Sequence, residues 1–133
     1  MANSSRKWIF LFTAILVLTS ACIRPPVHTT SATYEGYQLD EVWRAALKAL
    51  HDIDFMPYEI DRHSGIITAQ SGRLYVPDVH PHISLIITRE YGKVYVDCKV
   101  RQFDHYVDVF GLNKKISRSF YSALSERLRR LGD

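Results

Sequence analysis

The sequence has few cysteines, scattered glycines and almost no excess of one charge. Its six glycines never cluster into a loop that could cradle a phosphate group, and no nucleophile elbow is present. The two cysteines are Cys22 and Cys98. No internal repeat or low-complexity tract interrupts the chain.

The charge balance argues against a nucleic-acid partner. The formal charge is +3, but Arg6 and Lys7 stand before an apolar run at the amino terminus. Without residues 1–21, the chain keeps 15 basic and 14 acidic side chains. A nearly neutral protein lacks the basic surface that a phosphate backbone requires. At 133 residues, with 47% hydrophobic and 23% charged side chains, the chain is expected to form one folded domain.

The amino terminus has the three-part layout of a secretory signal peptide. A basic start, "NSSRK", precedes the apolar run "WIFLFTAILVL" and the small residues Thr19, Ser20 and Ala21. The uncharged stretch from Trp8 to Ile23 covers 16 residues, whereas a spanning helix needs roughly 20. We therefore predict that residues 1–21 are a signal peptide.

The stretch "LTSAC", residues 18–22, resembles the lipobox of bacterial lipoproteins. Ala21 and Ser20 match the family's pattern, whereas Thr19 stands where the family prefers Leu. The resemblance implies that Cys22 carries the lipid and that cleavage occurs just before it. Ile23, in place of the Asp that retains many such proteins in the inner membrane, implies the periplasmic face of the outer membrane. No other cofactor is expected.

Two further expectations follow for the mature chain. Residues 22–35 read as the lipidated cysteine and an extended tether, because Pro25, Pro26 and the Ser/Thr-rich segment after them offer no core. With Cys22 acylated, Cys98 is the remaining thiol and no internal disulfide is available. An exposed thiol is a hazard in an oxidising compartment, so Cys98 should be buried.

Residues 36–133 are expected to form a single α+β domain. The segment "LDEVWRAALKALHD" has the apolar spacing of one helix, residues 39–52, and "NKKISRSFYSALSERLRRLGD" has that of a second helix with Asn113 as its N-cap. Between them, two strands surround a turn at residues 61–65, with Pro57 favouring an edge position. A short leading strand near residues 34–38 is an additional option.

A second hairpin is predicted around Tyr91 and Gly92. If these two residues form the turn, Leu85 faces Cys98 and His82 faces Arg101. One side of this hairpin is apolar and the other is polar. The predicted fold is therefore a two-layer domain in which an antiparallel sheet of about four strands packs against two amphipathic helices, in the order helix, strands, helix.

This element order, with "LDEVWRAALKAL" and "SGIITA", loosely resembles the small sheet-and-helix domains of outer-membrane lipoproteins, including the accessory lipoprotein of the β-barrel assembly machinery. The resemblance covers residues 36–131 and contains no chemical motif. It therefore implies a fold and a setting rather than an activity.

The sequence contains one candidate catalytic cluster and one candidate metal site, and each also has a simpler structural explanation. The segment "DRHS" places Asp61, His63 and Ser64 together, but at a turn, where triad geometry is rare. Metal-ligating residue types gather in "HPH" and "DHYVD", where surface histidines are the alternative. These residues are His80, His82, Asp104, His105 and Asp108.

The remaining candidates form surfaces. Along the last helix, Lys114, Arg118, Ser122, Ser125 and Arg129 follow the spacing of one ridge, which is either a solvated face or a contact for anionic head groups or an acidic partner. Arg127 falls inside the apolar stripe, where it either snorkels or pairs with a carboxylate. Leu74, Tyr75 and Val76 are apolar within a loop, and they belong either to the core or to a contact patch. The expected partner surface comprises Lys114, Arg118, Arg129, Tyr75, His82 and Arg101.

The leading hypothesis is a non-enzymatic lipoprotein, anchored to the membrane by acyl chains, that binds an envelope protein or a cell-wall component. One alternative is a carrier that holds a lipid or small apolar ligand between the helices and the sheet. Another is a small metal-binding or hydrolytic lipoprotein.

Overall fold

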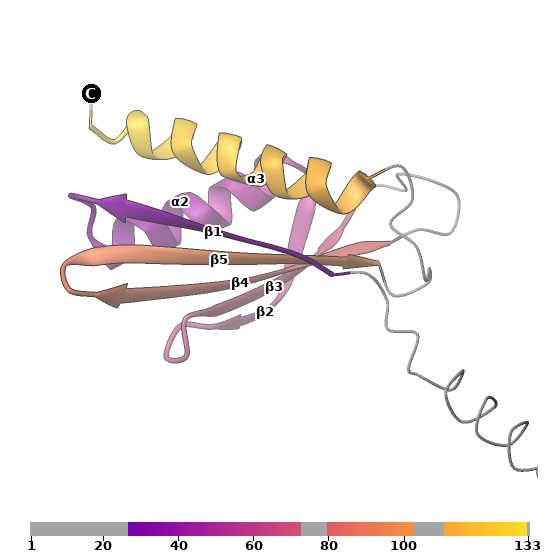
Figure 1. The fold of residues 1–133 in the computed structure, drawn as a ribbon, viewed down its shortest axis with the longest axis horizontal. Helices are drawn as coiled ribbons and strands as arrows, with labels where there is room; N and C mark the ends of the chain where they lie inside the picture. Colours follow the sequence, from indigo (N-terminus) through magenta and orange to yellow (C-terminus); the bar gives the residue numbers. More distant parts are fainter. Residues whose placement is uncertain (1–26, 73–79, 103–110, 133) are drawn as a thin grey trace, which may run out of the picture.

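A computed structural model describes residues 27–72, 80–102 and 111–132. Along the chain it contains β1 (Val27–Glu35), α2 (Leu39–Asp52), β2 (Phe55–Asp61), β3 (Ile66–Ser71), β4 (Pro81–Glu90), β5 (Lys93–Gln102) and α3 (Leu112–Arg129). The five strands form one antiparallel sheet in the order β1-β5-β4-β3-β2. Both helices lie on the same side of this sheet (Figure 1).

The helices run antiparallel to one another, with the end of α3 beside the start of α2 (Figure 1). Their apolar faces and the inward-facing strand residues make one core, because alternate strand positions point toward the helices. The largest fully buried apolar side chains are Phe55, Phe120, Leu50, Ile67, Ile83, Leu85, Leu124 and Leu128. The expected α+β class, with two helices on an antiparallel sheet, is confirmed.

The predicted register of the second hairpin is confirmed. Leu85 pairs with Cys98 and His82 with Arg101. Tyr91 and Gly92 form the turn with φ values of 50° and 79°, which is the backbone that a two-residue hairpin loop requires. Cys98 is fully buried, as predicted.

The segment before the first helix was assigned wrongly in part. Residues 27–35, expected to be tether, form β1 and pair with β5 along their whole length. The order is therefore strand, helix, strands, helix, and the sheet has five strands rather than about four. Thr30 and Ala32 turn toward α3 and are half-buried, whereas Thr29 and Thr33 face solvent. This half-buried alternation is typical of an edge strand with a modest apolar content.

The start of α3 also differs from the prediction. Gly111, with φ of 63°, precedes the helix, and Asn113 lies inside it and is buried. The Gln102 side-chain amide donates a hydrogen bond of 2.8 Å to the Asn113 side-chain oxygen. Asn113 is therefore not the N-cap: its side chain joins α3 to the end of β5.

Candidate functional site

An open groove runs between β1 and α3, along the helix from Lys114 to Ser125. Its volume is about 440 Å³. It is lined by His28, Thr30, Lys114, Ser117, Arg118, Tyr121, Ser122 and Ser125. Among these described residues, cations and hydroxyl groups dominate and none is acidic. We call it the β1–α3 groove.

The floor of the β1–α3 groove is built from hydroxyl contacts that attach α3 to the sheet. The Tyr121 hydroxyl lies 2.8 Å from the backbone oxygens of both Thr30 and Val96. The Thr30 and Ser117 hydroxyls bond to one another across the same interface. These contacts fix the position of α3 along β1, so the groove is a preformed feature of the packed domain.

Burial controls the titration of the groups beneath the groove. It raises the pKa of the Cys98 thiol to about 12, against a smaller opposing effect of a hydrogen bond with Ser117. Burial also raises the pKa values of Tyr121 and Tyr34 above their ordinary value. These groups therefore stay neutral at physiological pH, and the charge of the groove comes from its basic residues.

The basic residues near the start of α3, of which Lys114 and Arg118 line the groove, oppose the helix dipole. Lys114, Lys115 and Arg118 occupy the first two turns of α3 and are exposed, and the first turn contains no acidic residue. The amino end of a helix carries partial positive charge, so cations there destabilise it and anions nearby are favoured. Within the ranges that the structure describes, none of these three side chains forms an ion pair. Their placement therefore does not serve helix stability.

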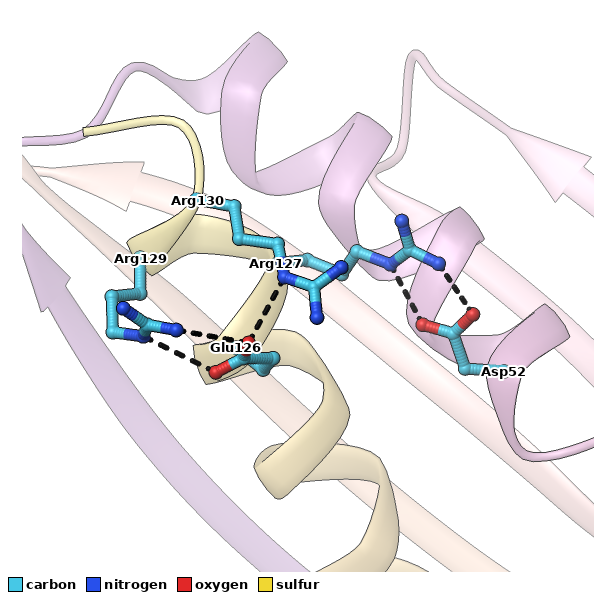
Figure 2. Close-up of polar contacts among 5 residues, drawn as sticks. All are labelled: Asp52, Glu126, Arg127, Arg129 and Arg130. Carbon is cyan, nitrogen blue, oxygen red and sulfur yellow. Dashed lines mark hydrogen bonds and ion pairs between the residues drawn. The ribbon is translucent and has the colours of Figure 1, made fainter. Parts of the chain in front are cut away.

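The carboxyl end of α3 is arranged differently (Figure 2). The Arg127 guanidinium donates two hydrogen bonds, of 2.7 and 2.6 Å, to the Asp52 carboxylate of α2. Glu126 accepts bonds from Arg129 at 3.0 and 3.2 Å and from Arg130 at 2.9 Å. Hydrogen bonding to these arginines holds the pKa values of Asp52 and Glu126 below their ordinary range. Of the two roles considered for Arg127, the structure shows pairing with a carboxylate.

The open face of the sheet forms a separate surface. His82 and Arg101 are cross-strand neighbours on it. The Tyr58 ring meets the His82 ring edge-on at 5.9 Å between centroids, and its hydroxyl lies 3.3 Å from Nδ1. This face lies on the side of the sheet away from both helices (Figure 1).

The six residues of the expected partner surface therefore do not form one patch. Lys114 and Arg118 border the β1–α3 groove, and Arg129 is occupied by Glu126 at the other end of α3. His82 and Arg101 lie on the open sheet face. Tyr75 lies outside the described residues, as do Leu74, Val76 and the proposed lipidation site Cys22.

The candidate centres for chemistry are only partly described. Asp61 accepts bonds from the backbone N–H groups of His63 and Ser64 and from the Ser64 hydroxyl, so these residues build the turn before β3. Ser64 is therefore held by a carboxylate rather than by a histidine base. Asp104, His105 and Asp108 lie outside the described residues, and within the described ranges no three His, Cys, Asp or Glu side chains gather around a common point.

Sequence reasoning missed three parts of the groove. His28 and Thr30 were assigned to the tether. Tyr121 was not singled out as the residue that links α3 to β1. The absence of acidic residues from the first turn of α3 was the available signal, since it reverses the usual pattern.

No family model matches the chain, and no curated protein matches it. Solved structures that resemble it include TTHA0849 from Thermus thermophilus, with 12% identity, a TM-score of 0.44 and coverage of 81% of this chain and 100% of that one. Ara h 8.0201 has 9% identity and a TM-score of 0.42, with coverage of 79% of this chain and 99% of that one. An uncharacterised protein from Rhizobium leguminosarum has 12% identity and a TM-score of 0.37, with coverage of 80% of this chain and 99% of that one. At these TM-scores the likeness carries no functional argument.

None of the helices in the described residues is long and apolar enough to span a membrane.

Proposed function

We propose that this protein is a lipid-anchored, non-enzymatic binding component of the bacterial cell envelope, attached through Cys22. The observation that carries the proposal is the spacing between the lipobox-like sequence and the fold. Four residues separate Cys22 from Val27, where β1 begins. Cleavage before Cys22 would therefore leave every described strand and helix intact, and the acylated cysteine would adjoin the domain.

The short spacing has a mechanical consequence. Five Cα-to-Cα steps lead from Cys22 to Val27, and such a segment spans at most roughly 18 Å. An anchored domain would stay beside the membrane and would not reach far across the periplasm. Two or three acyl chains hold a protein firmly, whereas a single chain is marginal.

The packing of the core favours a binding component over an apolar-ligand carrier. The space between the helices and the sheet is filled by large side chains such as Phe55, Phe120 and Leu124, all fully buried. A carrier would have to displace them to admit a ligand there. The open sheet face around His82 and Arg101 is our proposed contact for an envelope protein or a cell-wall component, with the outer membrane as the proposed location.

Intact-mass measurement of the protein from the membrane fraction tests this proposal, with Cys22→Ala as the matched variant. The expected wild-type mass lacks residues 1–21 and includes acyl chains, and the variant shows neither change. Crosslinking from a photoreactive residue at Arg101 would then capture the partner. A wild-type protein that retains residues 1–21, or that is soluble without acyl chains, would refute the lipoprotein proposal.

A further inference from the structure

We propose that the β1–α3 groove binds the head group of an anionic phospholipid in the membrane that holds the anchor. This inference rests on the proposed function for its geometry, since it places the groove within reach of the membrane. It goes further by assigning a ligand class and by fixing which side of the domain faces the lipid.

Chain connectivity brings the groove to the anchor. His28 lines the groove and stands six positions after Cys22 in the sequence. The start of β1 and the start of α3 lie at the same end of the molecule (Figure 1). A lipid-anchored Cys22 would therefore hold this end of the domain against the membrane surface, while the carboxyl end of α3 points away from it.

The chemistry of the groove fits a phosphodiester. Lys114 and Arg118 supply positive charge, and the exposed hydroxyl of Ser122 supplies a hydrogen-bond donor beside them. Arginine binds phosphate oxygens through paired N–H groups, and lysine binds them as a point charge. The partial positive charge at the start of α3 adds to the same field.

The position of the cations supplies an independent argument. Lys114 and Lys115 stand in the first turn of α3, where cations are least favourable, Arg118 follows in the second turn, and none of the three forms an ion pair with a described residue. An anionic ligand would remove this conflict. In the sequence, Arg24 adds a further positive charge two positions after Cys22. Basic clusters next to a lipid anchor are the usual mark of contact with anionic head groups.

Fluorescence quenching by lipid tests this orientation in the acylated full protein. A dye is attached to Ser122→Cys at the groove and, in a second sample, to Glu90→Cys at the opposite end of the sheet. Burial keeps Cys98 from competing, because its pKa is raised to about 12. Each protein is reconstituted into vesicles of phosphatidylcholine, alone or mixed with phosphatidylglycerol, that contain head-group quencher lipids.

The expected result is strong quenching at position 122 in the phosphatidylglycerol vesicles, weaker quenching in phosphatidylcholine alone, and little at position 90 in either. Each basic side chain near an anionic surface raises the docking equilibrium constant roughly fivefold. Replacing Lys114, Lys115 and Arg118 with Gln should therefore lower the docking equilibrium constant by roughly a hundredfold. A matched variant with Arg44, Lys48 and Arg89 replaced by Gln should dock like the wild type.

Four results would overturn the inference. One is equal quenching at positions 122 and 90. Another is quenching of the same size with and without phosphatidylglycerol, and the third is an equal loss of docking in both charge variants. Displacement by inorganic phosphate as effective as that by soluble dihexanoyl-phosphatidylglycerol would identify a free-phosphate site and would also overturn it.

A separate arm distinguishes this failure from failure of the proposed function. Binding of dihexanoyl-phosphatidylglycerol, compared with dihexanoyl-phosphatidylcholine, is measured on the detergent-solubilised full chain whether or not Cys22 is acylated. Selective binding that is lost in the Lys114, Lys115 and Arg118 variant supports the groove even if the mass shows no acylation. Acylated protein without such binding keeps the lipoprotein proposal and refutes the groove.

Discussion

The two ends of α3 carry similar charges but use them differently. At the carboxyl end, Arg127 pairs with Asp52 and both Arg129 and Arg130 pair with Glu126, so these cations stabilise the local structure (Figure 2). At the amino end, Lys114 and Arg118 border a groove, and neither forms an ion pair with a described residue. The paired charges stabilise the local structure, whereas we propose that the cations at the amino end bind an anionic partner.

The two ends of α3 are also attached to the rest of the domain in different ways. The amino end is attached by the buried hydrogen bond between Gln102 and Asn113, and the middle of the helix by the part-buried contact of Tyr121 with β1. At the carboxyl end, the Arg127–Asp52 pair joins α3 to α2 through side chains that are 35% and 32% exposed, whereas the pairs of Glu126 with Arg129 and Arg130 are local to the end of the helix. Screening by salt should therefore weaken the attachment at the carboxyl end and leave that at the amino end unchanged.

The largest loss of stability should come from truncating the core side chain at the middle of α3. Phe120 is fully buried at the middle of α3, and Phe120→Ala should lower the free energy of unfolding by about 3–5 kcal/mol. Urea unfolding followed by circular dichroism measures this change, with Ser119→Ala as the exposed control. A loss similar to that of the control would mean that α3 is not seated on the sheet as described.

Next in size is the buried amide pair at the amino end. Asn113→Ala leaves the Gln102 amide without its 2.8 Å acceptor and should cost about 1–3 kcal/mol, independent of salt. Replacing both residues with Leu should cost less than the single change, because no buried amide then remains. A double variant that is less stable than the single one would contradict this assignment.

Alkaline pH should weaken the amino half of α3 through Cys98. Burial raises the pKa of this thiol to about 12 from an ordinary value of 9.0. The unfolded chain loses the proton first, so this contribution to stability is fully present below pH 9 and declines as the pH rises toward 12. The free energy of unfolding of Cys98→Val should fall less steeply over this range than that of the wild type. Parallel slopes would contradict the prediction.

A smaller effect is expected at the carboxyl end. Asp52→Asn removes the bidentate pair with Arg127, whose two side chains are 32% and 35% exposed. The midpoint of thermal unfolding should fall by about 2–4 °C in low salt and by less in high salt. The pair lowers the pKa of Asp52, so its contribution is present at neutral pH and is lost as the carboxyl is protonated in acid. A salt-independent change would refute this account.

Much of this fold was predictable from local pattern. The β4–β5 register followed from alternation around Tyr91 and Gly92, and the burial of Cys98 followed from that register. Residues 27–33 of β1 were missed because Thr30 and Ala32 are only half-buried, so this Ser/Thr-rich stretch resembles a tether, whereas residues 34–35 fall within the optional leading strand. Asn113 was misassigned because N-cap preference is local, whereas its partner Gln102 lies on another element.

The candidate site was less predictable than the fold. Residue types on α3 indicated a basic ridge, but the facing wall of the groove comes from His28 and Thr30 on a strand that was not predicted. The alternation around Tyr91 and Gly92 did place His82 and Arg101 on the polar side of the hairpin, but it could not show that the cations of α3 lie on a different surface. A site formed between distant segments depends on the tertiary arrangement.

One paired measurement tests the contrast between the two ends most directly. Thermal unfolding and docking onto phosphatidylglycerol-containing vesicles are measured for two variants, one with Gln at Lys114, Lys115 and Arg118 and one with Gln at Arg127, Arg129 and Arg130. The first should unfold at the wild-type temperature or slightly above it and lose docking, whereas the second should unfold earlier and keep docking. If both variants lose docking equally, or if the first is the less stable, the two ends of α3 do not differ in the way proposed.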